Sequence, residues 1–173
     1  MTIVYFDSSA FVKLLVEEDG SDIAAALWDG CDAAVSSRLS YCEVRAALAA
    51  AGRDNRLEID AQQQAEVAWE EYWAAVRPVE LTETVAIHAG QLAGQHVLRG
   101  ADAVHLASAL ALNADELLFA AWDQRLRSGV ERAGIARAPA DEQVQPDGIQ
   151  SEERTAEPVP LTQPVAGLQE HHP

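Results

Sequence analysis

Short apolar runs that alternate with helical segments constrain the fold of this chain more than any other feature. Ile3–Phe6 is a continuous run of β-branched and aromatic residues, which is typical of a strand buried on both faces. The segments between such runs carry apolar residues at three- and four-residue spacings, which indicates helices. The alternation predicts an α/β fold, with a short central parallel β-sheet flanked by helices on both sides. Ligands of such sheets bind beyond the carboxyl ends of the strands.

The expected strands are residues 3–6, 33–37, 79–81 and 117–120, with a last short strand near Ile135. Helices are expected over residues 8–16, 21–28, 40–51, 58–76, 84–98, 101–112 and 123–133. Six of the seven prolines follow Arg137, mixed with Gln, Glu, Ser and Gly in a segment without apolar periodicity. We therefore expect one folded domain over residues 1–137 and an acidic, Pro-rich, disordered tail over residues 138–173.

The composition also bears on location. No apolar run approaches the roughly 18 residues that a membrane span needs, and Ile3–Phe6 lacks the basic flank of a signal peptide. The two cysteines, Cys31 and Cys42, form neither a CxxC motif nor a disulfide framework. The sequence predicts a cytoplasmic protein without membrane contact.

The formal net charge of −16, from 12 Lys and Arg against 28 Asp and Glu, argues against general nucleic-acid binding. The tail from residue 138 onward accounts for part of it, with seven acids against Arg154. An acidic domain can still act on phosphates if carboxylates hold Mg²⁺ and local arginines contact the backbone.

Four acids stand at or near the start of predicted helices: Asp7, Glu43, Asp102 and Asp123. Each has a structural alternative, because acids favour the first turn of a helix and Asp is a common N-cap. Glu43 also completes a capping box with Ser40. Position alone leaves both interpretations open for all four.

Four blocks of this sequence resemble, in order and spacing, the signature blocks of PIN domains. They are YFDSSA at 5–10, YCEVRAAL at 41–48, LRGADAVHLA at 98–107 and WDQRL at 122–126. The resemblance spans residues 1–136, and the Gly-Ala-Asp block is similar to that of VapC toxins. One departure is Ala121, where many members of the family have Thr or Ser two residues before the fourth acid.

The resemblance implies a catalytic site of Asp7, Glu43, Asp102 and Asp123 at one end of the sheet. It implies Mg²⁺, or Mn²⁺ in its place, held above all by Asp7 and Asp102. The implied function is that of a toxin of a toxin–antitoxin pair. It would be an endoribonuclease that hydrolyses RNA with a metal-activated water and leaves a 5′-phosphate and a 3′-hydroxyl. The implied partners are RNA, a small cognate antitoxin protein and a second copy of the chain.

Further candidates and alternatives remain. His105, one turn after Asp102, can approach the site. The RNA backbone could be contacted by five arginines: Arg38, Arg45, Arg99, Arg125 and Arg127. The alternatives to a toxin are a non-catalytic PIN-like module that binds a partner through Trp69, Tyr72 and Trp73, and a stand-alone RNA-processing nuclease.

Overall fold

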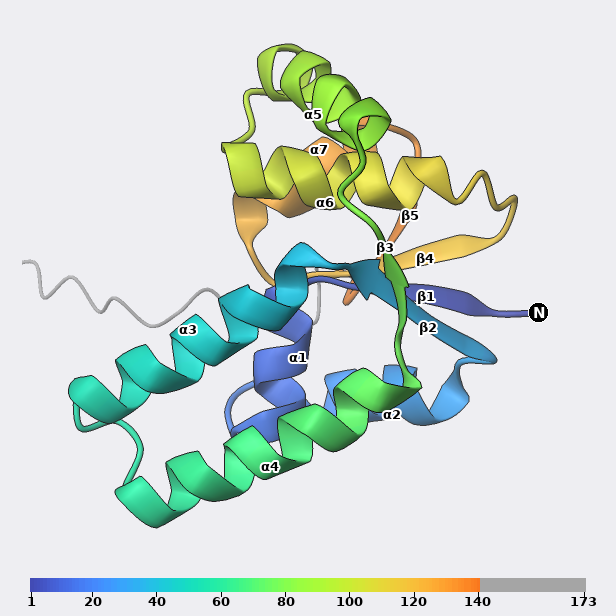
Figure 1. Ribbon diagram of the computed structural model, residues 1–173. Helices are drawn as coiled ribbons and strands as arrows, with labels where there is room; N and C mark the ends of the chain where they lie inside the picture. The colour runs from blue at the N-terminus through green and yellow to red at the C-terminus, as the bar shows by residue number, and fades with distance from the viewer. Residues whose placement is uncertain (141–173) are drawn as a thin grey trace, which may run out of the picture.

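The computed structural model describes residues 1–140 as a parallel sheet between two layers of helices (Figure 1). The strands are β1 (Ile3–Phe6), β2 (Ala33–Ser37), β3 (Arg77–Val79), β4 (Leu117–Ala120) and β5 (Ala136–Ala138). The helices are α1 (Ser8–Leu15), α2 (Ser21–Gly30), α3 (Leu39–Arg53), α4 (Ile59–Ala75), α5 (Glu83–His96), α6 (Gly100–Ala111) and α7 (Gln124–Arg132). The sheet order is β3-β2-β1-β4-β5, and every neighbouring pair is parallel. The predicted α/β architecture is confirmed.

Strand β1 is the centre of the sheet and is buried on both faces. It pairs with β2 on one side and with β4 on the other. Tyr5 packs into the layer of α5, α6 and α7, whereas Val4 and Phe6 pack into the layer of α1 to α4. The two-residue period of the strand thus divides its apolar side chains between two cores, which is why the run has no polar interruption.

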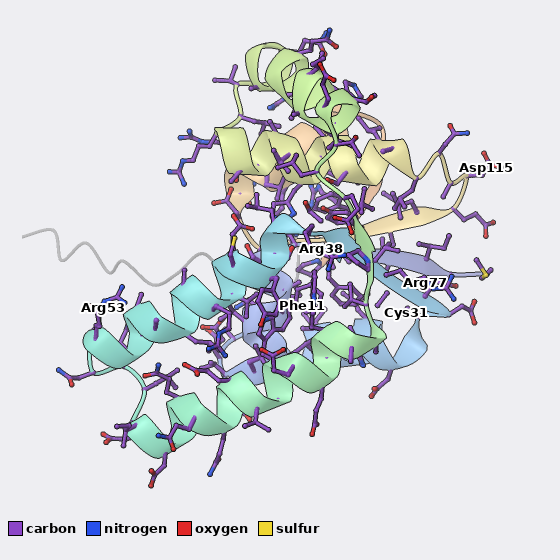
Figure 2. All side chains as sticks on the ribbon, viewed as in Figure 1. Phe11, Cys31, Arg38, Arg53, Arg77 and Asp115 are labelled. Carbon is purple, nitrogen blue, oxygen red and sulfur yellow. The ribbon has the colours of Figure 1, made fainter. Side chains whose placement is uncertain are left out.

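The second core contains an aromatic cluster that the sequence had offered as a docking face. Trp69 on α4 is fully buried, and its ring lies 5.0 Å from that of Phe11 on α1. Phe11 is seen at the centre of this helical layer in Figure 2. Tyr72 and Trp73 pack against the same cluster and are half-buried. The hypothesis of partner binding through Trp69 is therefore wrong, because this side chain belongs to the core.

Two strand positions differ from the prediction. Strand β3 begins at Arg77 and contains Pro78, which we had placed before the strand. Proline is tolerated there because β3 is at the edge of the sheet. Strand β5 ends at Ala138, one residue beyond the expected domain end at residue 137.

The rest of the predicted tail, from residue 141 on, lies outside the described residues. Within residues 1–140, no helix combines the length and apolar character required to cross a lipid bilayer.

Candidate active site

Asp7 lies at the carboxyl end of the central strand and caps the helix that follows. Its Oδ1 accepts hydrogen bonds from the Ala10 amide at 3.0 Å and from the Ser9 hydroxyl at 2.7 Å. Both bonds use the same oxygen, and within residues 1–140 Oδ2 accepts none. Asp7 therefore caps helix α1 and keeps one oxygen for another partner.

Ser9 connects Asp7 to the neighbouring strand. Its hydroxyl oxygen accepts a hydrogen bond from the Trp122 amide at 2.9 Å while the hydroxyl donates to Asp7. The Asp7 amide also donates to the Ala120 carbonyl at the end of β4. Our sequence reasoning missed this role of Ser9. The available signal was a short hydroxyl side chain two residues after the acid.

Burial makes Asp7 an unusual carboxyl group. Only 3% of the residue is exposed, and this burial raises the pKa of Asp7 to about 6. The charge of Glu43 raises the pKa further, whereas His105 and the bonds from Ser9 and Ala10 oppose the shift. The ionised form is thus held at an energetic cost, which a bound cation would reduce.

Glu43 points toward the site and does not cap its helix. Helix α3 begins at Leu39, and the Ser40 hydroxyl is buried against the Ser36 hydroxyl at 2.6 Å. The carboxylate of Glu43 instead contacts His105, with Oε2 and Nε2 separated by 2.7 Å. The capping-box interpretation of Ser40 and Glu43 is therefore wrong, because the helix starts before Ser40 and the serine is bonded elsewhere.

His105 on α6 is the link between Glu43 and the central strand. It is 2% exposed, and its Nδ1 lies 3.0 Å from the Tyr5 hydroxyl. The imidazole can satisfy both contacts at once, since Nε2 can donate its hydrogen to Glu43 while Nδ1 shares a hydrogen bond with the Tyr5 hydroxyl. The three-residue spacing from Asp102 had indicated that His105 approaches the site, but no sequence pattern indicated its partners.

Asp102 and Asp123 form a second pair of acids on neighbouring helices. Asp102 accepts a hydrogen bond on Oδ2 from the Arg99 amide at 3.3 Å, and Asp123 accepts one on Oδ1 from the Leu126 amide at 2.9 Å. Partial burial raises the pKa of Asp102, and the nearby charge of Asp123 adds to the shift. The two carboxylates are thus close enough to repel each other.

The four acids therefore form two pairs, Asp7 with Glu43 and Asp102 with Asp123. His105 acts electrostatically on both Asp7 and Asp102, which places it between the pairs. Within the described part of the chain, no three His, Cys, Asp or Glu side chains are grouped closely enough to hold a metal ion as they stand. A cation at this site would rest on two protein carboxylates with water completing its shell, an arrangement that Mg²⁺ commonly adopts.

The arginines divide into three groups. Arg38 is paired with Glu80, and Arg45 contacts Glu66 at 3.3 Å. Arg127 is 1% exposed and donates to the carbonyls of Ala121 and Pro139, so its predicted contact with RNA is wrong. Its role is structural, because it joins the end of β4 to the segment after β5. Arg99 and Arg125 are exposed and form no ion pair with residues 1–140.

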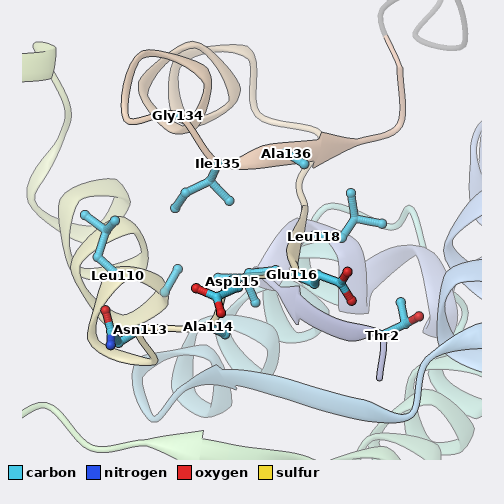
Figure 3. Close-up of a pocket in the computed structure, with 12 residues that line it drawn as sticks. Thr2, Leu110, Asn113, Ala114, Asp115, Glu116, Leu118, Gly134, Ile135 and Ala136 are labelled. Carbon is cyan, nitrogen blue, oxygen red and sulfur yellow. The ribbon is translucent and has the colours of Figure 1, made fainter.

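A hollow of about 560 Å³ lies at the opposite end of the sheet, around the amino ends of β1, β4 and β5 (Figure 3). Its lining includes Thr2, Asp115 and Glu116 but none of the four site acids. Strands of a parallel sheet carry their ligand sites at the carboxyl ends. This hollow is therefore not part of the candidate site.

Known proteins share this architecture. The PIN domain family profile matches residues 4–128 of the chain. The chain belongs to the PIN domain family.

Two solved structures share the PIN fold at low sequence identity. FitAcB from Neisseria gonorrhoeae matches with a TM-score of 0.55 and 17% sequence identity. The match covers 78% of this chain and 95% of the FitAcB chain. VapBC2 from Rickettsia felis, solved with a promoter DNA fragment, has a TM-score of 0.53 and 11% identity, with coverages of 79% and 97%.

This PIN domain also has relatives of much higher identity. Ribonuclease VapC45 and Ribonuclease VapC49, from two strains of Mycobacterium tuberculosis, are each 63% identical to it over 140 residues. That match covers 81% of this chain and 97% of each relative. Ribonuclease VapC46 of the same species is 32% identical over 136 residues, covering 79% of this chain and 96% of the relative. The predicted resemblance to VapC-type PIN domains is confirmed.

The pKa of Asp7 predicts how stability depends on pH. A folded-state pKa of about 6, above the ordinary 3.8, means that Asp7 lowers stability as the pH rises from about 4 to 6. In metal-free buffer, Asp7→Asn should therefore raise the free energy of unfolding above pH 6.5, by up to about 3 kcal/mol, and should not raise it at pH 4. Urea unfolding of both proteins across this range measures the difference. A gain that is the same at both pH values would contradict the assignment.

The contacts of His105 predict different effects for two conservative substitutions. In His105→Gln an amide can replace Nε2 and donate to Glu43, whereas in His105→Asn the shorter side chain can reach only toward Tyr5. Both should lower stability by about 1–3 kcal/mol, because each leaves one buried partner unsatisfied. If His105 positions Glu43, RNA cleavage should fall about 10–100-fold further in His105→Asn than in His105→Gln. Equal activities at equal stability would mean that the contact with Glu43 has only a structural role.

Proposed function

We propose that this PIN domain is a Mg²⁺-dependent endoribonuclease and acts as the toxin of a toxin–antitoxin pair. The observation that carries this proposal is that four carboxylates form two pairs, Asp7 with Glu43 and Asp102 with Asp123, and that His105 acts on an acid of each pair. Each carboxylate is fixed through one oxygen by the protein, and its second oxygen accepts no hydrogen bond from residues 1–140. The identity of 63% with two proteins named as ribonucleases supports RNA as the substrate.

The donor set fits a hard divalent cation. The available ligands are carboxylate oxygens, which Mg²⁺ and Mn²⁺ prefer over softer donors. The raised pKa of Asp7 reflects uncompensated negative charge in a buried place, which favours cation binding. We assign the ion mainly to one acid of each pair, Asp7 and Asp102. When bound, it would neutralise phosphate charge and make water more acidic.

The protein's own groups would prepare the site for hydrolysis. Ser9 and the Ala10 amide fix the orientation of Asp7, and His105 fixes that of Glu43. Glu43 and Asp123 would then accept a proton from the attacking water or orient it. Attack at phosphorus breaks the bond to the 3′ oxygen of the preceding nucleotide. The products are a 5′-phosphate and a 3′-hydroxyl.

The toxin role implies a protein that blocks the site. VapBC2, whose fold this chain shares, was solved bound to a DNA fragment from its promoter, and the chain is 63% identical to two ribonucleases named VapC. We propose a small antitoxin that covers the acidic site, with a basic side chain directed toward Asp7 and Glu43. We also propose that the toxin forms a homodimer.

The catalytic proposal predicts that neutral substitutes inactivate the enzyme without unfolding it. Asp7→Asn and Asp102→Asn should each reduce Mg²⁺-dependent cleavage of total RNA by about 100-fold or more. Their melting temperatures should be unchanged or higher, since one repelling charge is removed. The measurement is cleavage of purified RNA with and without Mg²⁺, followed by mapping of the cut ends.

Asp115→Asn is the matched control, because Asp115 is exposed and lies at the far end of the sheet in Figure 2. It should leave cleavage unchanged. Activity that persists in a chelator, cut ends with cyclic phosphates, or full activity in Asp7→Asn would each reject the proposed mechanism.

The toxin proposal is tested separately by expression. Induction of the wild-type chain in a bacterial host should stop growth, whereas Asp7→Asn should not. Co-expression of the product of a small adjacent reading frame should restore growth and should co-purify with the toxin. A nuclease that is active in vitro but whose expression leaves growth unaffected would indicate a stand-alone RNA-processing enzyme.

A further inference from the structure

A shallow hollow of about 650 Å³ lies between the end of α5 and one face of α7. Seven residues line it: Gln95, His96, Val97, Gln124, Arg125, Ser128 and Arg132. None of them is acidic, although the chain as a whole carries a net charge of −16. The hollow therefore offers hydrogen-bond donors from two arginines and two side-chain amides, on a protein whose surface is otherwise rich in acids.

The hollow begins beside the candidate active site. Gln124 and Arg125 directly follow Asp123, and on α7 the residues Gln124, Ser128 and Arg132 are spaced four apart and share one helix face. At the other wall, Val97 is two residues from Arg99, whose backbone amide donates to Asp102. The lining therefore runs from the residue after Asp123 along α7 to Arg132.

The arginines that line the hollow differ from Arg38 and Arg45, near α3 and α4, in whether acids of the protein already pair with them. Arg38 and Arg45 are already engaged by Glu80, Glu66 and Glu70. Arg125 is exposed and forms no ion pair with any acid in residues 1–140. Arg132 donates to the His96 carbonyl, which holds it at the wall of the hollow. Arg125 and Arg132 are therefore available to an anion, unlike Arg38 and Arg45.

We propose that this hollow binds the phosphate backbone of the RNA strand adjacent to the scissile bond. This inference rests on the proposed function, since it extends the path of the substrate away from the carboxylates. Arg125 and Arg132 would contact phosphate oxygens, and the Gln95 and Gln124 side-chain amides would donate to phosphate or sugar. Such contacts carry affinity and strand register and no base specificity. They also explain how an acidic protein holds a polyanion, because the acids surround the scissile phosphate and the arginines bind its neighbour.

The test measures RNA binding and RNA cleavage separately with the same three variants. Binding is measured in the Asp102→Asn background, which should not cleave the RNA, and cleavage is measured in the otherwise wild-type chain. Arg125→Gln and the double variant Arg125→Gln/Arg132→Gln remove charge from the hollow. Arg53→Gln is the matched control, because Arg53 is exposed, forms no ion pair with the described residues and lies at the far tip of α3 in Figure 2. The probes are a fluorescein-labelled single-stranded RNA of mixed sequence and, in parallel, poly-glutamate as an acidic peptide.

Binding of RNA, followed by fluorescence anisotropy from 50 to 300 mM KCl, should weaken in the order control, single variant, double variant. The slope of log affinity against log salt should fall by about 0.7 for each arginine removed, as expected for one phosphate contact on a single strand. In cleavage, KM should rise while kcat changes little, because the hollow lies beside the reacting atoms and not at them.

Measurable RNA binding that is equal in the control and in both hollow variants would overturn the inference. Loss of poly-glutamate binding with unchanged RNA binding would overturn it too, and would assign the hollow to an acidic protein partner. Failure of the proposed function gives a different result. RNA would then bind no variant, or would bind without Mg²⁺-dependent cleavage in the wild-type chain.

Discussion

The burial of a carboxylate at the end of the central strand is the constraint on which the rest of this structure depends. Asp7 follows a strand that is covered on both faces, so its side chain has almost no contact with water. Its ionised form must be stabilised by neighbours, and the Ser9 hydroxyl, the Ala10 amide and His105 all contribute. These groups offset only part of the cost, because the pKa remains raised to about 6. The place is therefore suited to a cation, and the fold adds the negative charge of Glu43 nearby.

Capping a helix and serving a reaction are compatible roles for the same acid. Asp7 and Asp123 each cap a helix through Oδ1, and Asp102 accepts the Arg99 amide through Oδ2. A carboxylate has two oxygens, and the bond made by one fixes the direction of the other. Helix capping thereby orients these acids at no further cost in side-chain entropy. Glu43 is the exception, since it is oriented by His105 and not by a helix end.

Net charge is a poor guide to what this protein can bind. The overall value of −16 argued against RNA, but it does not describe how the charges are placed. On the α3–α4 side, Arg45 is engaged by acids of α4. On the α7 side, Arg125 and Arg132 line a hollow that contains no acid. Interactions between charges fall off within about 8–10 Å at physiological salt, so a nearby phosphate responds to the local arrangement.

The sequence by itself determined the alternation of strands and helices, the burial of β1 and the position of Asp7, Asp102 and Asp123 at helix starts. These features are local, because periodicity and capping preferences act over a few residues. Only the tertiary structure determined which residue Glu43 contacts and what Ser9 and His105 do. It also determined the burial of Arg127 and the place of Pro78 in an edge strand. The deciding contacts join distant residues: Glu43 and His105 are 62 positions apart, Tyr5 and His105 are 100 apart, and Ser9 and Trp122 are 113 apart. No local pattern encodes such pairs, since they exist only when parallel strands align their carboxyl ends.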